Sequence, residues 1–315
     1  MKLIIYMPAF NEEETITQVL ANLPQHLEAV DEIETLVIDD GSTDQTAALA
    51  RGCGAQVISH YRNRGVGAAF HSAVQYALEN GADILVGIDA DGQFDAAEIQ
   101  DLIAPILAGQ AHLVTGNRFS AGIPANMPRV KYWGNQSVAR LVSSVCGQHF
   151  TDVSCGFRAY HREALYRLNV FAQFTYTHET ILSLVYQGMR VVEQPIRVTY
   201  HPRRESRVAN SILRYAVQTS KIIFRVMLDY RPMRVFGTLG GVCIAIGAAF
   251  EAFLAGHYLL TQTFTPYKNF GFIGLGFVIF GMLVLLLAMI SDMLNRLRLN
   301  QDKLLYELKK IRYGK

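Results

Sequence analysis

The first 120 residues alternate short apolar runs with segments whose apolar residues recur every three to four positions. Short apolar runs between turn residues are typical of buried strands, and the longer spacing is typical of amphipathic helices. This alternation favours an α/β fold with a mainly parallel sheet and helices on both of its faces. The predicted strands are Leu3–Met7, Thr35–Asp39, Gln56–Ser59, Ile84–Ile88 and Leu113–Gly116. The predicted helices are Glu13–Leu23, Asp44–Gly52, Gly67–Asn80 and Glu98–Leu107, the first with a start at Asn11 and Glu14 that is similar to a capping box.

A different pattern begins near residue 235. Residues 235–260 are nearly uncharged, and the 21 residues from 270 to 290 carry no charge. A helix of this length spans about 32 Å, which matches the roughly 30 Å hydrocarbon core of a bilayer. We therefore predict a transmembrane hairpin over residues 235–291, with two buried helices of a soluble protein as the alternative. The overall 50% hydrophobic composition is thus an average over two unlike regions.

Charge sets the predicted topology and the domain boundaries. Basic residues flank the hairpin on both outer sides, whereas its connection holds only Lys268. The positive-inside rule then places both termini and the predicted α/β domain, residues 1–208, on the cytoplasmic side of the inner (plasma) membrane. Residues 209–234 mix apolar and basic positions at helical spacing, which indicates an amphipathic juxtamembrane helix on membrane lipids or, alternatively, a helix packed on the soluble domain. Residues 292–315 form a basic tail, and glycines in the first span are compatible with a homo-oligomer.

The candidate chemistry is concentrated after the fourth predicted strand. Asp89, Asp91 and Gln93 alternate in sequence, so in extended chain their side chains point the same way. Three hard oxygen donors suit Mg²⁺ or Mn²⁺ and suit zinc poorly. Such an ion could hold a diphosphate and stabilise its departure. The alternative is an acidic surface turn, which Asp and Gly also favour.

Other polar segments follow the remaining predicted strands, and ligands of such sheets bind beyond the carboxyl ends of the strands. These segments are 8–12, 39–44 and 116–118. The glycine turn at 62–69 leads into a helix N-terminus that could meet phosphate, or it is purely structural. A nicotinamide enzyme is disfavoured because the turn after the first strand has no glycine. The four scattered cysteines are expected to be buried apolar residues in a reducing compartment.

Taken together, these segments resemble the family 2 glycosyltransferases. The closer resemblance is to the polyprenyl-phosphate glycosyltransferases, which include dolichyl-phosphate mannose synthase and bacterial two-span transferases. It rests on Pro8-Ala9-Phe10-Asn11-Glu12, Asp39–Asp44, Asn63-Arg64-Gly65-Val66-Gly67-Ala68, Asp89–Gln93, Gly116-Asn117-Arg118 and Asp152–Arg158.

The resemblance implies a glycosyltransferase A-type fold and transfer of a sugar from a nucleotide-diphosphate sugar, with uridine favoured, to a polyprenyl phosphate. The implied donor-binding residues are Pro8, Asn11, Glu12, Asp39, Asp40, Asn63, Gly65 and Gly67. The implied catalytic residues are Asp89, Asp91, Arg118, Asp152 and Arg158. The acceptor phosphate would meet Arg118, Arg158, Arg204 and Arg207. No nucleic-acid partner is expected.

The sequence departs from the family pattern in two places. Val66 stands where members often carry Lys, and the segment Arg203–Arg207 lacks the glycine of the family's phosphate-binding motif near the membrane. The Gln-x-x-Arg-Trp motif of processive polysaccharide synthases is absent, and the only tryptophan is Trp133, which argues against a cellulose- or hyaluronan-type polymerase.

A phosphate monoester is largely dianionic at neutral pH, so it is already a nucleophile. We therefore predict an inverting transfer without an essential general base, in which Asp152 and Glu179 orient the sugar or an arginine. A lipid acceptor with a hydroxyl would require a base, and it remains an alternative. A catalytically silent membrane scaffold is another, although the intact Asp89 and Asp91 argue against it.

Overall fold

A computed structural model describes residues 1–169, 176–200, 217, 220–221, 224, 227–228 and 232–314. The chain forms two compact units, residues 1–223 with 305–315, and residues 224–304. Most of the predicted juxtamembrane helix, together with Arg204 and Arg207, lies outside the described residues.

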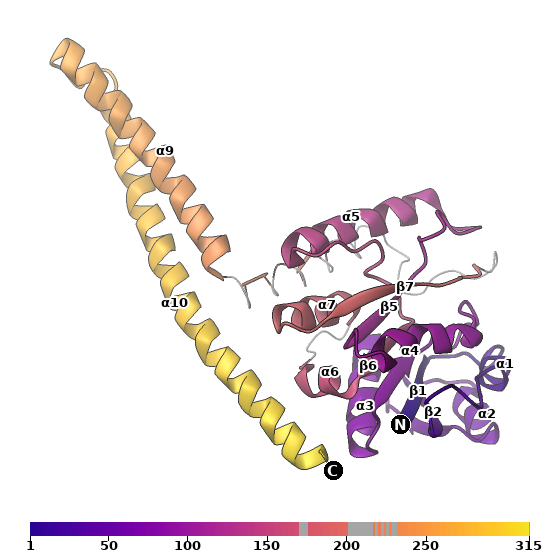
Figure 1. Cartoon of the computed structure of the whole chain (residues 1–315). Helices are drawn as coiled ribbons and strands as arrows, with labels where there is room; N and C mark the ends of the chain where they lie inside the picture. The colour runs from indigo at the N-terminus through magenta and orange to yellow at the C-terminus, as the bar shows by residue number, and fades with distance from the viewer. Residues whose placement is uncertain are drawn as a thin grey trace. The chain divides into compact units, whose positions relative to one another are not determined.

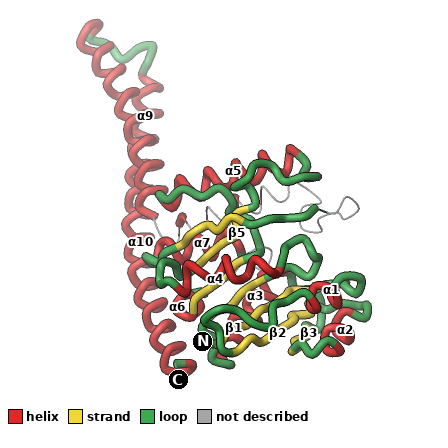
Figure 2. Tube along the Cα trace, turned by 45° about the vertical axis from the view of Figure 1, so that its right-hand side comes forward, coloured by secondary structure: helices red, strands yellow, loops and turns green. Residues whose placement is uncertain are grey.

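The first unit is built on a seven-stranded sheet (Figures 1 and 2). Its strands are β1 (Lys2–Ala9), β2 (Glu32–Asp39), β3 (Gln56–Ser59), β4 (Ile84–Gly87), β5 (Leu113–Asn117), β6 (Arg158–His161) and β7 (Val191–Pro195). They lie in the order β3-β2-β1-β4-β6-β5-β7, and only β6 runs antiparallel to its neighbours. The chain leaves β1 first toward β2 and later toward β4, so the strand order reverses beside β1, where open α/β sheets bind ligands. The predicted α/β fold is confirmed.

Helices cover both faces of this sheet (Figure 2). They are α1 (Ile16–Ala21), α2 (Thr46–Gly52), α3 (Val66–Glu79), α4 (Ile99–Leu107, after the 3₁₀ turn Ala96–Glu98), α5 (Arg129–Cys146), α6 (Arg162–Arg167) and α7 (Thr177–Tyr186). Side chains alternate along β1, so Ile5 and Met7 join one core with α1 and α4. Tyr6 points to the other face, where its ring contacts Phe70 of α3 and its hydroxyl bonds the Tyr176 hydroxyl at 2.7 Å.

The predicted elements of the first 120 residues are all present, but α1 is shorter than expected. The chain at Asn11 has a φ of +53°, and its side-chain oxygen accepts the backbone N–H of Thr43 at 2.8 Å. The prediction of a capping box at Asn11 is therefore wrong. The Asn11 side chain accepts a hydrogen bond from the neighbouring loop, and helix α1 begins only at Ile16.

The second unit contains two long apolar helices, α9 (Pro232–Thr261) and most of α10 (Lys268–Tyr313). Both are long and apolar enough to cross a membrane. Glycines let them approach closely: a Cβ added to Gly240 would lie 2.9 Å from the Gly281 carbonyl oxygen, and one added to Gly247 would lie 2.6 Å from that of Gly274. Small residues at such positions are typical of helix pairs in lipid.

The predicted tail continues α10 without a break as far as Tyr313. Its last turns belong to the first unit. There the Tyr306 hydroxyl bonds Glu163 at 2.8 Å, and the Lys309 ammonium bonds the Leu168 carbonyl at 2.8 Å.

Candidate active site

The predicted metal ligands lie together at the end of β4. The Gln93 side-chain nitrogen contacts the Asp91 carboxylate at 2.7 Å, and the Gln93 backbone N–H donates to the same group at 3.0 Å. Burial raises the pKa of Asp89 to about 7; the nearby Asp91 adds to the rise and Arg118 opposes it. Two buried carboxylates repel each other when both are ionised. A divalent cation bound between them would relieve this repulsion, so the pair suits such an ion.

The segment before β6 passes close to Asp89. A Cβ added to Gly156 would lie 3.1 Å from both carboxylate oxygens of Asp89. Glycine therefore allows the backbone before β6 to come close to Asp89. Because β6 is antiparallel, its first residues lie at the same sheet edge as the last residues of β4.

Hydrogen bonds join the loop after β1 to the turn that carries the predicted metal ligands. The Thr15 hydroxyl donates to the Ala90 carbonyl oxygen at 2.8 Å, between Asp89 and Asp91. The Glu12 backbone N–H donates to Thr46 at 2.8 Å, and the Asn11 N–H donates to Ser42 at 2.9 Å. These bonds join the loops after β1 and β2, where the donor residues Pro8, Asn11 and Glu12 were predicted.

The neighbouring aspartates after β2 have different roles. Asp40 accepts the backbone N–H groups of Arg64 and Gly65, at 3.0 and 2.7 Å, and pairs with the His60 ring at 2.6 Å. Asp40 therefore holds the glycine turn at Asn63–Gly67, in which Gly65 has a φ of +91° that side-chain-bearing residues rarely adopt. Asp39 is also buried, and it accepts the Ser42 N–H at 2.9 Å. His60 was not predicted, since nothing in its local sequence links it to Asp40.

Arg118 and Asp152 form a two-pronged ion pair. The Arg118 Nε and Nη2 atoms lie 2.7 and 2.8 Å from the two carboxylate oxygens of Asp152, and Nη2 also lies 2.8 Å from the Ser154 hydroxyl. Burial alone would raise the pKa of Asp152, but Arg118 outweighs it and keeps this pKa below its usual value. Asp152 is thus an ionised group that orients an arginine, which agrees with the expectation from the sequence.

The structure contradicts the role predicted for Arg158. This side chain is fully buried, and it donates to the carbonyl oxygens of Cys155, Val153 and Thr177 at 2.7, 2.9 and 2.7 Å. Its planar fork fastens the segment before β6 to α7, so it cannot reach an acceptor phosphate. Glu179 lies in the first turn of the same helix.

Two residues that the sequence reasoning missed lie beside Arg118. The Tyr200 hydroxyl is 3.3 Å from the Arg118 Nη1 atom, and the Lys131 ammonium lies 5.1 Å from the centre of the Tyr200 ring. Burial and then Arg118 lower the pKa of Lys131, while Asp91 raises it. The sequence does contain a signal for Lys131, because this residue lies in a stretch, residues 118–151, that has no acidic residue.

The chain after β7 brings Tyr200 to this place. The Thr199 N–H donates to the Gln93 carbonyl oxygen at 2.9 Å, and Val198 forms an isolated bridge with Phe94. The turn that carries the predicted metal ligands is therefore held from two sides, by Thr15 and by residues 198–199.

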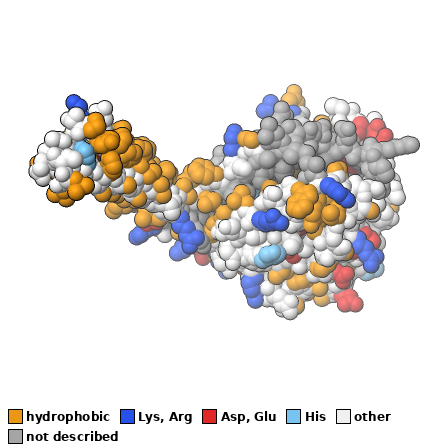
Figure 3. Space-filling model, turned by 90° about the horizontal axis from the view of Figure 1, so that it is seen from above, with side chains coloured by type: hydrophobic (Ala, Val, Ile, Leu, Met, Phe, Trp, Pro, Cys, Tyr) orange, Lys and Arg blue, Asp and Glu red, His pale blue; other side chains and the backbone are white. Residues whose placement is uncertain are grey.

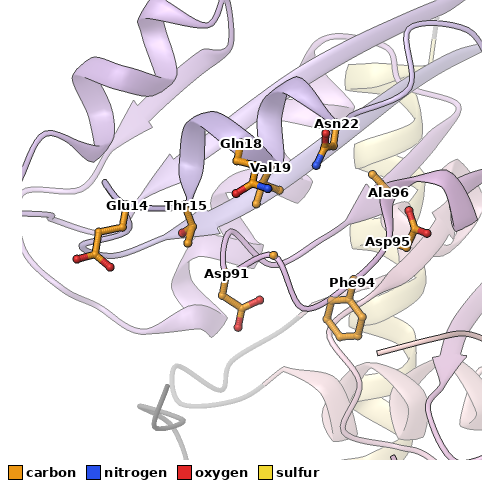
Figure 4. A pocket seen from close by; sticks show the side chains of 10 residues that line it. Glu14, Thr15, Gln18, Val19, Asn22, Asp91, Phe94, Asp95 and Ala96 are labelled. Carbon is orange, nitrogen blue, oxygen red and sulfur yellow. The ribbon is translucent and has the colours of Figure 1, made fainter. Parts of the chain in front are cut away.

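A hollow of about 490 Å³ lies between α1 and the chain that follows Asp91 (Figure 4). Among the predicted site residues only Asp91 lines it, together with Glu14, Thr15, Gln18, Val19, Asn22, Gly92, Phe94, Asp95 and Ala96. Neither Asp89 nor Arg118 is among its lining residues, so we do not place the reaction there. Within the described residues, no group of three His, Cys, Asp or Glu side chains could hold a metal. The ligand set predicted after β4 falls outside that criterion, since it consists of two carboxylates and an amide.

Comparison with known proteins agrees with this geometry. The family model described as Glycosyl transferase family 2 matches residues 4–168. Glycosyltransferase AglJ of Haloferax volcanii is 27% identical over 309 residues, covering 96% of this chain and 97% of that protein. A UDP-N-acetylglucosamine–dolichyl-phosphate N-acetylglucosaminyltransferase of Methanococcus voltae is 29% identical over 71% of this chain and 95% of its own. Glucosyl-3-phosphoglycerate synthase of Mycobacterium tuberculosis, solved with Mn²⁺, UDP-glucose and phosphoglyceric acid, has a similar fold, with a TM-score of 0.57 at 21% identity over 71% of this chain and 79% of that one.

Proposed function

The chain belongs to the family 2 glycosyltransferases, and from this premise we propose that it transfers a sugar from a uridine-diphosphate sugar to a polyprenyl phosphate, with inversion and with a divalent metal. The observation that carries the proposal is the meeting of two groups of opposite charge. Asp89 and Asp91 follow strand β4, and the positive charge of Arg118 acts on the pKa of Asp89 while the charge of Asp91 acts on the pKa of Lys131. An acidic site for a metal-bound diphosphate and a basic site for a second phosphate are what this reaction needs.

The donor would lie across the loops after β1, β2 and β4. Glu12 and Asp39 would accept hydrogen bonds from the base or ribose, while Asp40 holds the glycine turn at Asn63–Gly67. Asp89, Asp91 and Gln93 would hold Mg²⁺ or Mn²⁺, which when bound neutralises a diphosphate leaving group. The bond from Thr15 to Ala90 keeps the donor loop and the ligand turn in register.

The acceptor phosphate would lie at Arg118 and Lys131. Arg118 is held in one orientation by Asp152 and Ser154, so it needs little reorganisation when an anion arrives. A lysine ammonium close to Arg118 and to the Tyr200 ring adds a second, more mobile positive charge. The name of the Methanococcus relative, which includes dolichyl phosphate, supports a lipid phosphate as acceptor.

The transfer needs no base from the protein. A phosphate oxygen forms a bond to the anomeric carbon while the bond from that carbon to the diphosphate oxygen breaks, and the electron pair leaves with the nucleoside diphosphate. No proton moves in this step because the nucleophile is already an anion. Asp152, whose two oxygens both bind Arg118, serves as an orienting group. Positioning and charge stabilisation supply the rate.

The reaction would take place at the cytoplasmic face of the membrane. The apolar lengths of α9 and α10 support membrane insertion, and the basic residues that flank them support cytoplasmic termini.

The proposal is tested with the full-length protein in detergent, Mn²⁺, a panel of radiolabelled nucleotide sugars, and two acceptors. Undecaprenyl phosphate and diacylglycerol are supplied in parallel, and label extracted into organic solvent is counted. We expect transfer to undecaprenyl phosphate that EDTA abolishes and added metal restores. Transfer to diacylglycerol alone would establish the hydroxyl-lipid alternative, and transfer to neither acceptor from any donor would overturn the proposal.

A further inference from the structure

The outer side of α5 carries a continuous exposed stripe. At 100° per residue, the exposed positions fall within an arc of about 120° on the helix. They are Arg129, Trp133, Ser137, Arg140, Leu141 and Ser144. Trp133 is 58% exposed and Leu141 is 42% exposed, although the opposite side, at Ala139 and Val142, is buried in the domain. We call these six residues the α5 stripe.

The charge around the α5 stripe has one sign. No acidic residue occurs from 118 to 151, whereas Arg129 and Arg140 lie in the stripe itself. In the loop before the helix, Ile123 is 49% exposed. Figure 3, which looks down on the molecule from above, shows hydrophobic and basic side chains gathered together on this face of the first unit.

The α5 stripe is connected to the candidate site by aromatic contacts. The Trp133 ring packs edge-on against Tyr132 at 6.0 Å, and Tyr132 packs in the same way against Phe119 at 5.3 Å. The guanidinium of Arg118 lies 5.4 Å from the centre of the Phe119 ring. Exposure falls along this row, from the exposed Trp133 to the buried Phe119.

A surface that combines a half-exposed tryptophan, an aliphatic side chain and arginines without acids has the chemistry of a membrane interface. Tryptophan prefers the level of the lipid headgroups, and arginine can bury its stem there while its head meets phosphate. Each basic residue near an anionic surface adds to the attraction. We propose that the α5 stripe lies on an anionic bilayer surface and holds the catalytic domain against lipid. This contact goes beyond sugar transfer and does not depend on which donor or acceptor is used.

The single tryptophan makes the contact directly measurable, because no tryptophan occurs in α9 or α10. The full-length protein is placed in nanodiscs of either phosphatidylcholine alone or phosphatidylcholine mixed with phosphatidylglycerol, which gives the bilayer a negative surface charge. Fluorescence is excited where tyrosine does not absorb. Quenching by brominated lipid reports contact with the bilayer, and quenching by acrylamide reports contact with water. We expect bromolipid quenching that is stronger in the anionic nanodiscs, together with protection from acrylamide.

Two variants then measure separately how much charge and apolar contact contribute to docking of the α5 stripe on the bilayer. Arg140→Gln should lower the ratio of docked to undocked helix by about fivefold in the anionic discs, with little change in neutral ones. Leu141→Asn should lower it in both. The matched controls are Arg51→Gln and Leu49→Asn on α2, exposed positions outside the stripe that should leave the fluorescence unchanged.

Three results would overturn the proposal. Acrylamide quenching without bromolipid quenching would show that the stripe faces water. Protection from both quenchers would indicate a second copy of the chain in place of lipid. Equal bromolipid quenching in neutral and anionic discs would remove the role assigned to charge. None of these results bears on whether the chain transfers sugar, which is measured separately in detergent.

Discussion

The two halves of the candidate site are opposite in charge and in how they are held. The donor half, residues 1–99, presents carboxylates on turns that follow parallel strands, and short hydrogen bonds join those turns to one another. The acceptor half, residues 117–200, presents Arg118 and Lys131, and buried ion pairs and aromatic rings hold them. The proposed reaction between two anions would use both halves: the carboxylates would hold a cation that neutralises the diphosphate, and the basic residues would neutralise the acceptor phosphate.

The charged groups of the two halves also differ in whether the protein itself satisfies them. Asp89 and Asp91 retain mutual repulsion that a cation would relieve. Arg158, by contrast, has its donors occupied by carbonyl oxygens inside the protein. Substitution should therefore affect activity in the first case and stability in the second.

The largest effect is expected in the donor half. Asp91→Asn should lower the transfer rate by about 1,000-fold, because loss of a charged metal ligand removes stabilisation of the leaving diphosphate. The rate is measured at saturating Mn²⁺, and the melting temperature should change little. Asp95→Asn is the matched control, since Asp95 is exposed and only caps the turn before α4. A fully active Asp91→Asn variant would refute the metal assignment.

The buried arginine of the acceptor half should give a different result. Arg158→Met should lower the free energy of unfolding by about 3 kcal/mol, because several buried carbonyl oxygens lose their donor. Denaturant unfolding measures the loss, and activity is compared per folded molecule at low temperature, where it should be largely retained. Unchanged stability combined with lost activity would restore Arg158 to the acceptor site.

A smaller and more selective effect is expected at Lys131. Lys131→Gln should raise the KM for the lipid phosphate about tenfold, since one charge-assisted contact is lost. The KM for the nucleotide sugar should stay within about twofold, because donor and acceptor contacts lie in different halves. Steady-state kinetics with each substrate varied in turn makes the measurement, and Lys303→Gln in the tail serves as control. Equal changes in both constants would contradict the division of the site.

The smallest effect concerns two thiols. Burial raises the pKa of Cys155 in the acceptor half to about 12, so its reactive thiolate is scarce at pH 8 and grows only as the pH rises toward 12. Cys53 in the donor half is exposed. A maleimide at pH 8 should label Cys53 in minutes and leave Cys155 unlabelled until the protein unfolds, as mass spectrometry of digests would show. Rapid labelling of Cys155 would mean that the segment before β6 opens readily.

Most of the donor half could be predicted from local sequence. The apolar runs of β1 to β5 are short and bounded by turns, and parallel strands bring their carboxyl ends to one edge whatever their exact order. That is why Asp89, Asp91 and the loops after β1 and β2 could be placed together in advance. The length and lack of charge in residues 270–290 likewise predict a span from composition alone, because a bilayer demands only length and apolarity.

Tertiary structure alone decided the acceptor half. Strand β6 inserts antiparallel between β4 and β5, and this pairing brings Asp152 to Arg118 across 34 residues of sequence. The same pairing buries Arg158, which follows Asp152 by six residues. In the sequence, Arg118 and Arg158 both stand next to apolar residues. No local pattern distinguishes an arginine that pairs with a carboxylate from one that binds backbone carbonyls, because the difference lies in which distant segment packs against it.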